Sequence, residues 1–129
     1  MPEKENKSGR FAYDGLSRIF HEKARLSIMT SLLTSSDGLL FTELKELCSL
    51  TDGNLSRHIQ HLQEEGLVNV FKGFKNKRPQ TLCRLTDSGK KQFIDYLIEL
   101  EKVIKDASAA SMTEYKVHDN NSIEGWLSA

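Results

Sequence analysis

The chain has 129 residues, 38% of them hydrophobic and 28% charged, and its formal net charge is zero. This composition supplies apolar surface for one packed domain with short extensions and excludes global disorder. No apolar run approaches the roughly 18 to 20 residues that cross a bilayer. Residues 1–10 also lack the apolar core of a secretory signal, so we expect a cytoplasmic protein with no membrane partner.

The charges are distributed unevenly along the chain. Residues 68–91 contain seven basic residues and one acidic residue, whereas residues 106–129 contain one basic and four acidic residues. Because charges beyond about 8 to 10 Å are largely screened, a partner responds to this local excess and not to the zero total. We predict a flexible tail over residues 1–13, one domain over 14–105 and an extension over 106–129.

The first predicted elements are helical. Apolar residues recur at helical spacing over residues 14–33, with a break between two helical pieces expected at Glu22 and Lys23. A turn over residues 35–38 and a small strand over 39–41 follow. Thr42 is then expected to cap a short helix that has Glu43 in its first turn, and the buried side of this helix is predicted to hold Leu44, Leu47 and Cys48.

The next helix has the clearest pattern of the chain. It is expected to begin at a cap provided by Thr51 or Asp52 and to run to about Glu65, with Gly66 as the residue that closes it. Leu55, Ile59 and Leu62 fall on one face, at positions i, i+4 and i+7. The opposite face is polar and comprises Gly53, Asn54, Ser56, Arg57 and Gln60, with His61 on its flank.

A basic hairpin is predicted after this helix. Residues 68–72 and 81–85 alternate as strands do, and the loop over 73–80 contains glycine, proline and basic residues. Thr86 is expected to cap a final helix that ends near Lys105. Its apolar stripe is broader than one small domain needs, so we predict that part of it meets a second copy, through Phe93, Ile94, Leu97, Ile98, Leu100 and Ile104.

This order of elements predicts a mainly α (α+β) winged helix-turn-helix with a two-stranded wing and a long C-terminal dimerisation helix. Such folds place their second helix, here residues 51–65, in the major groove of DNA. Arg57 could donate bidentately to guanine, and Asn54 or Gln60 to adenine. The wing, residues 72–80, is expected on the backbone or minor groove. The predicted DNA-binding residues are Gly53, Asn54, Ser56, Arg57, Gln60, His61, Lys75, Lys77 and Arg78.

Other interpretations remain at this point. Asp52 is better explained as a helix cap than as a DNA contact, and His58 as a partly buried histidine. A protein-interaction module without sequence-specific DNA binding is the alternative function, since winged helices also bind proteins. No nucleophile–base arrangement or phosphate-binding glycine loop indicates an enzyme. The histidines are scattered and Cys48 and Cys83 have no metal-ligand spacing, so neither a metal nor a cofactor is predicted.

Several motifs carry a family resemblance over about residues 16–105. They are His21 followed by Arg25-Leu26, the run Leu50-Thr51-Asp52-Gly53-Asn54-Leu55-Ser56, the run Glu64-Glu65-Gly66-Leu67-Val68, and Leu85-Thr86-Asp87-Ser88-Gly89. The chain resembles short MarR/ArsR-like winged-helix DNA-binding transcriptional regulators, which implies a homodimeric, sequence-specific regulator that binds double-stranded DNA.

The resemblance also bears on ligands. Metal-sensing relatives carry paired cysteines in the helix before the one that enters the major groove, but the corresponding stretch of this chain, residues 46–50, has Cys48 alone, which argues against thiolate metal sensing. Many MarR-like relatives bind small molecules between their dimer helices, so an effector stays open, although no residue pattern in this chain supports one.

Overall fold

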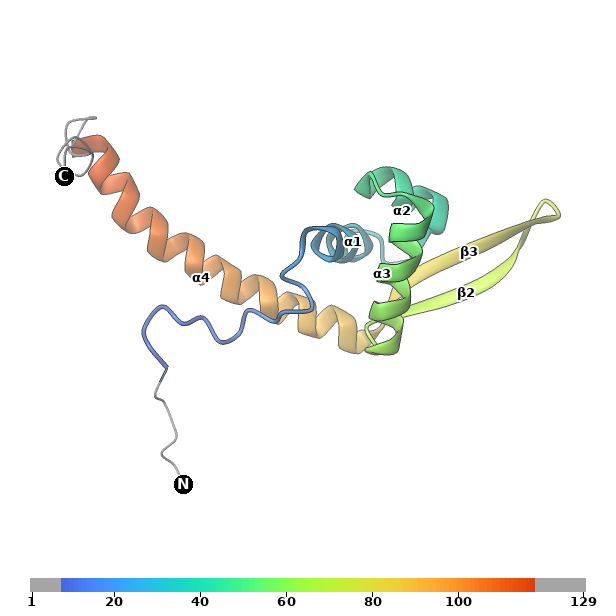
Figure 1. The fold of residues 1–129 in the computed structure, drawn as a ribbon, viewed down its shortest axis with the longest axis horizontal. Helices are drawn as coiled ribbons and strands as arrows, with labels where there is room; N and C mark the ends of the chain where they lie inside the picture. Colours follow the sequence, from blue (N-terminus) through green and yellow to red (C-terminus); the bar gives the residue numbers. More distant parts are fainter. Residues whose placement is uncertain (1–7, 118–129) are drawn as a thin grey trace, which may run out of the picture. The chain divides into compact units, whose positions relative to one another are not determined.

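The computed structural model describes residues 8–117, with side chains described as far as Ser111 (Figure 1). Residues 1–7 and 118–129, at the ends of the predicted tail and extension, lie outside the described part. The chain forms two compact units, Gly15–Leu97 and, among described residues, 8–14 with 98–117. The elements are α1 (Lys23–Leu33), β1 (Leu39–Leu40), α2 (Phe41–Cys48), α3 (Asp52–Glu64), β2 (Val68–Lys75), β3 (Arg78–Leu85) and α4 (Asp87–Val117).

Helix α1 begins later than the sequence predicts. A carboxylate oxygen of Glu22 accepts the Arg25 backbone N–H at 2.8 Å and caps the helix. Glu22 has extended backbone angles, which a capping residue needs and which end any helix before it. Residues 14–22 form turns and bends instead. The predicted break at Glu22 and Lys23 is therefore confirmed, but the helical piece before it was wrong.

Helix α2 also starts away from its predicted cap. Leu40 is the capping residue, and its backbone N–H donates to the Glu43 carboxylate at 2.8 Å. Thr42 already lies inside the helix, so its predicted role as the cap was wrong, whereas Glu43 occupies the first turn as expected. Leu44 is buried but Leu47 is exposed, which makes the buried side narrower than predicted.

Both ends of α3 are confirmed. The Thr51 hydroxyl oxygen accepts the backbone N–H of Asn54 at 3.2 Å, so Thr51 and not Asp52 is the cap. At the other end Gly66 has a φ of +76°, a conformation that favours glycine. This turn lets the Leu67 N–H donate to the Leu62 carbonyl at 2.9 Å, and it buries Leu67.

The three strands form one antiparallel sheet in the order β1-β3-β2. Leu39 pairs with Cys83, and β2 and β3 pair along their whole length from Val68 opposite Leu85 to Lys75 opposite Arg78. The strands of the hairpin therefore extend well into the loop predicted over residues 73–80, and that part of the prediction was wrong.

A two-residue turn closes the hairpin. Asn76 and Lys77 both have positive φ, +53° and +66°, as a type I′ turn requires. Pro79, which falls in the loop predicted over residues 73–80, instead lies in β3 opposite Phe74. Because β1 pairs only with Leu82 and Cys83, Pro79 occupies a part of β3 with a single neighbour, where a proline is tolerated.

Helix α4 has the predicted start and a later end. The Thr86 hydroxyl oxygen accepts the Gly89 N–H at 2.8 Å, which confirms the cap. A Cβ on Gly89 would lie 2.1 Å from the Leu67 carbonyl oxygen, so only glycine allows this approach of α4 to the chain before β2. The helix continues beyond Lys105 to Val117, and the predicted end was wrong.

An aromatic cluster fixes the first part of α4 within its unit. The Phe20 ring packs edge-on against Phe93 and Tyr96, at centroid distances of 5.2 and 5.6 Å. Phe93 is 0% exposed and has no surface left for a second copy, which removes it from the predicted dimer interface. Cys83 is buried, and burial raises the pKa of its thiol to about 11.

The second unit contains residues 8–14 and the later part of α4. The Tyr13 hydroxyl donates to a carboxylate oxygen of Asp106 at 2.6 Å, and this hydrogen bond raises the pKa of Tyr13. The end of the segment predicted as a flexible tail is thus attached to α4. In the described part of the chain, no helix has the length and apolar character needed to cross a membrane.

Candidate nucleic-acid interface

The two sides of α3 differ sharply in exposure. Leu55, Ile59 and Leu62 are buried, so this side fixes the helix on the body of its unit. Six residues of the other side and its flank are all exposed, and the sequence predicted every one of them to lie on the polar face of this helix or at its flank. They are Gly53, Asn54, Ser56, Arg57, Gln60 and His61.

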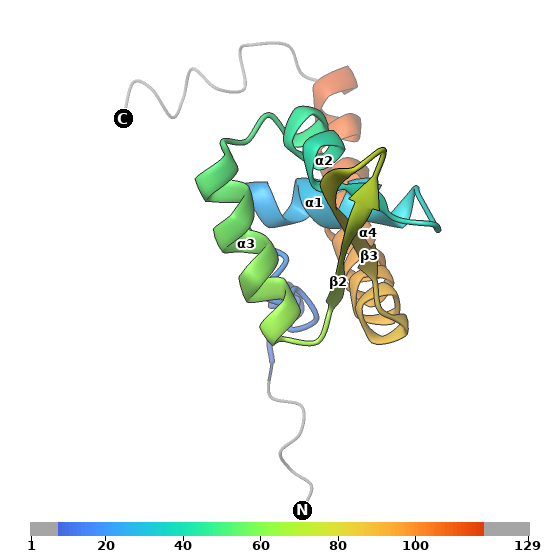
Figure 2. The same ribbon diagram turned by 90° about the vertical axis from the view of Figure 1, so that its right-hand side faces the viewer.

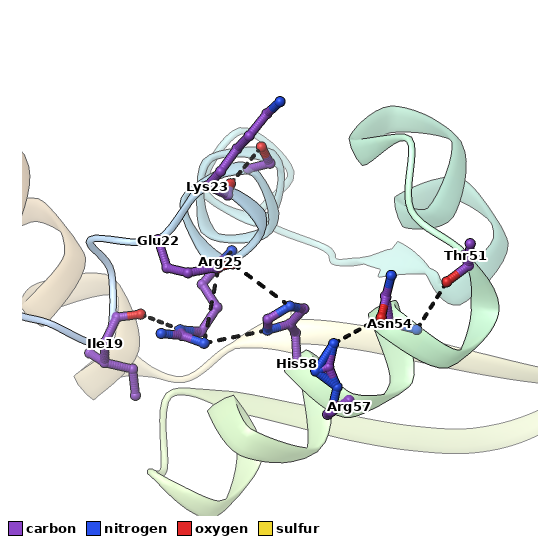
Figure 3. Close-up of polar contacts among 9 residues, drawn as sticks. Ile19, Glu22, Lys23, Arg25, Thr51, Asn54, Arg57 and His58 are labelled. Atoms are coloured by element: carbon purple, nitrogen blue, oxygen red, sulfur yellow. Dashed lines mark hydrogen bonds and ion pairs between the residues drawn. The ribbon is translucent and has the colours of Figure 1, made fainter.

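Arg57 is the central cation of this exposed face. One guanidinium nitrogen donates to the side-chain oxygen of Asn54 at 2.8 Å, one helical turn earlier (Figure 3). This contact uses one of the five N–H donors of the guanidinium, and it leaves the Asn54 amide donors available. The pair can therefore present several hydrogen-bond donors at once from neighbouring positions on α3.

A hydrogen-bonded cluster lies at the buried edge of α3. The Arg25 guanidinium donates to the Ile19 carbonyl at 2.6 Å and to Nδ1 of His58 at 3.4 Å (Figure 3). A Glu22 carboxylate oxygen lies 4.0 Å from the other ring nitrogen of His58. Arg25 thus connects the segment before α1, the start of α1 and α3.

The partners of His58 determine its protonation state. Arginine can only donate hydrogen bonds, so Nδ1 must accept, which requires a neutral ring with its proton on Nε2. Burial lowers the pKa of His58, with the Glu22 carboxylate opposing that shift. The predicted partly buried histidine is confirmed. The role of Arg25 was missed, because its contact with His58 joins residues 33 positions apart.

Asp52 lies at the start of α3, but it does not cap the helix. Its carboxylate pairs with the Lys45 ammonium of α2 at 3.0 Å. Both side chains are well exposed, so the pair contributes little stability, within about 1 kcal/mol. It joins the two helices on either side of the turn.

The hairpin lies beside α3 (Figure 2), and its tip extends beyond the helices of this unit (Figure 1). Lys75 and Arg78 face each other across the last rung, and Lys77 is in the turn itself. All three are exposed. Between Gly66 and Thr86 the sequence has five basic residues and no acidic residue, so the hairpin is a cationic surface next to the polar face of α3.

The fold and this pairing of surfaces agree with a comparison against known families. The family described as "Winged helix DNA-binding domain" matches residues 24–104. The chain belongs to this family. The match spans the region from α1 into α4, so it includes α3 and the whole hairpin.

Individual relatives support the assignment. An uncharacterized protein of Methanocaldococcus jannaschii is 34% identical to this winged-helix protein over 88 residues, 68% of this chain and 95% of the relative. A transcriptional regulator homologue from Pyrococcus horikoshii OT3 has the same identity and a TM-score of 0.66, with 70% of this chain and 89% of that chain covered. The M. tuberculosis transcriptional regulator MOSR, solved with DNA, shares the fold at 20% identity and a TM-score of 0.59, covering 77% and 71% of the two chains.

These comparisons confirm the resemblance to winged-helix DNA-binding transcriptional regulators and the predicted winged-helix fold. They bear on the domain as a whole and not on single side chains, so the base-reading and phosphate-binding residues remain predictions. Among residues 8–111, no group of three histidine, cysteine, aspartate or glutamate side chains could hold a metal ion.

Proposed function

We propose that this winged-helix regulator binds double-stranded DNA in a sequence-specific manner as a homodimer. The observation that carries the proposal is the juxtaposition of the exposed polar face of α3 with a hairpin that has no acidic residue. In this arrangement α3 enters the major groove, and the wing, residues 72–80, contacts the backbone or minor groove. The protein acts by binding and not by catalysis.

The chemistry of α3 supports base reading. Arg57 has the planar donor geometry that suits the O6 and N7 acceptors of guanine, and Asn54 and Gln60 have the amides that suit adenine. Gly53 lies at the start of the helix with open space around it, which allows a close approach of the backbone to DNA. His61 and Ser56 complete the exposed face of α3.

The wing supplies a different kind of contact. Lys75, Lys77 and Arg78 are cations at an exposed tip, and such side chains bind phosphates without reading the sequence. Each neutralised phosphate releases counterions, so these contacts make binding depend steeply on salt.

The apolar surface of α4 supports the homodimer. Ile98 and Ile104 are 52% and 56% exposed, a large exposure for isoleucine side chains on a helix. Ile94 is also exposed, and Leu97 and Leu100 are partly exposed on the same helix. Two copies packed along this stripe would remove these side chains from water.

Selection of DNA by the full chain tests the proposal. The protein is incubated with a pool of random-sequence duplexes, and bound duplexes are enriched. Binding of the selected duplex and of a scrambled duplex is then measured by gel shift. We expect enrichment of an approximate inverted repeat, because a two-fold symmetric dimer places two α3 helices on two half-sites. Failure to retard any duplex at low salt would contradict the proposal and favour a protein-interaction module.

A further inference from the structure

The wing carries an exposed aromatic side chain that the functions above do not use. Phe74 is 79% exposed, the largest exposure among the large hydrophobic side chains of the described residues. It lies one residue before the end of β2, directly opposite Pro79. The rung before the last one of the hairpin is thus apolar across both strands, in a segment that is otherwise strongly basic.

Strand alternation places Phe74 and Phe71, the other aromatic residue of the hairpin, on opposite faces. Lys72 and Phe74 point to one face of the hairpin, and Phe71 and Lys75 to the opposite face. The Arg84 guanidinium covers the Phe71 ring at 5.2 Å, which leaves Phe71 42% exposed. Among residues 8–111, no ring or cation contact involves Phe74.

The charge around Phe74 indicates what kind of partner it meets. The nine residues of the wing contain four cations, Lys72, Lys75, Lys77 and Arg78, and no acidic residue. A single ring surrounded by cations is far smaller than the roughly 800 Å² per partner that a stable protein interface buries. A polyanion with flat apolar surfaces between its charges fits both features, and duplex DNA has phosphates outside and stacked bases inside.

We propose that Phe74 is an apolar wedge that enters the minor groove, inserts partly between two base pairs and bends the DNA. This inference rests on the proposed DNA binding and deepens it, because it assigns the wing a role beyond phosphate contact. The cations on both sides of Phe74 hold the backbone while the ring unstacks one base step, and Pro79 lies opposite Phe74 on the neighbouring strand. Apolar side chains of this kind bend duplexes toward the major groove, by roughly 20° to 90°.

The wedge makes binding depend on the sequence of the DNA beside the bases that α3 reads, without hydrogen bonds to the bases of that flanking DNA. Pyrimidine–purine steps unstack and kink more easily than other steps. Under this proposal the wing prefers such steps at a fixed distance from the bases that α3 reads. Binding sites selected from a random pool therefore contain a flexible step on the outer side of each half-site.

The test compares Phe74→Ala, Phe74→Leu and Phe71→Ala in the full chain, on the duplex that the wild-type protein selects from a random pool. Bending is measured by gel mobility of circularly permuted fragments, and affinity by fluorescence anisotropy. We expect Phe74→Ala to lose the bend and to bind roughly 5- to 150-fold more weakly, the range for removal of one aromatic–base stack. Leucine at this position retains a wedge, so Phe74→Leu keeps most of the bend, and the matched control Phe71→Ala behaves as the wild type.

Two results overturn the inference while the proposed function survives. They are a straight complex with the wild-type protein, and a Phe74→Ala complex that bends and binds as the wild type does while Arg57→Ala loses specific binding. Failure of the wild type to bind any duplex rejects the proposed function itself. Because Phe74 is exposed, urea unfolding of Phe74→Ala should match the wild type and exclude misfolding as the cause of weaker binding.

Discussion

Helix α3 and the wing are neighbours, but they are built in different ways. Helix α3 is capped at Thr51, closed at Gly66, buried along Leu55, Ile59 and Leu62, and contacted by Arg25 through His58. The wing is exposed along both strands and is held mainly by its own ladder of strand pairs.

Under the proposed function, this difference separates two tasks. Reading bases requires hydrogen-bond donors held in a fixed position. The buried side of α3 holds the helix, and therefore the donors on its exposed face, in place. Binding phosphates requires cations that can adjust to the DNA backbone, and an exposed hairpin provides such cations. Substitutions on the inner side of α3 should therefore change stability, and substitutions in the wing should change binding alone.

The largest effect on stability is expected at the buried side of α3. Leu55→Ala removes a fully buried side chain and leaves a cavity, so the free energy of unfolding should fall by about 2 to 5 kcal/mol. The matched control is Ser56→Ala, the next residue, which is exposed and should change stability by less than about 0.5 kcal/mol. Urea unfolding monitored by circular dichroism measures both, and equal effects would contradict the inward orientation of Leu55.

A change of pH is expected to have a smaller effect on stability. Burial holds the folded-state pKa of His58 below its ordinary value of 6.5, so the unfolded state binds the proton more readily. His58 therefore contributes stability that is present above pH 6.5 and declines as the pH falls through that value. The pKa of Glu22 is also lowered, by its hydrogen bond to the Arg25 N–H, so its contribution is lost at lower pH, below the ordinary value of 4.5.

His58→Asn tests this assignment, because the asparagine oxygen can still accept from Arg25 but does not titrate. Unfolding in urea at about pH 7.5 and about pH 5.5 should show a smaller loss of stability in this variant than in the wild type. His61→Asn, an exposed control on the same helix, should retain the wild-type dependence. An identical pH dependence in all three proteins would exclude His58 as the titrating group.

The smallest effect on stability is expected in the wing. The double variant Lys75→Ala with Lys77→Ala should unfold within about 0.5 kcal/mol of the wild type, since both side chains are exposed. Its binding to DNA should nevertheless become less dependent on salt. The slope of log affinity against log salt should fall in magnitude by about 0.9 for each phosphate that the variant no longer neutralises. An unchanged slope would mean that these lysines do not bind phosphate.

The same contrast explains what could be predicted from the sequence. The ends of α3 and the start of α4 depend on local signals, the caps at Thr51 and Thr86 and the glycine at Gly66, and these were predicted. The polar and apolar sides of α3 follow from helical spacing alone. The exposed face that makes up most of the candidate site was therefore also predicted.

The remaining features depend on longer-range contacts or on ambiguous local signals. Gly73 and Pro79 suggested a loop, but the pairing of β2 with β3 extends through both of them to a turn at Asn76 and Lys77. Residues 106–111 have little apolar periodicity, yet their three alanines favour the helix that forms. The contact between Arg25 and His58 joins residues 33 positions apart, and no local pattern indicates it.

The central claim is that α3 reads bases and the wing binds phosphates, and Arg57→Ala tests it most directly. Affinity of the wild type and the variant is measured by fluorescence anisotropy at one salt concentration, on the selected duplex and on its scrambled counterpart. Removal of a bidentate hydrogen bond to guanine should weaken binding to the selected duplex by about 1 to 3 kcal/mol. Binding to the scrambled duplex should change far less. Equal weakening on both duplexes would contradict the claim, because Arg57 would then be one more phosphate-binding cation.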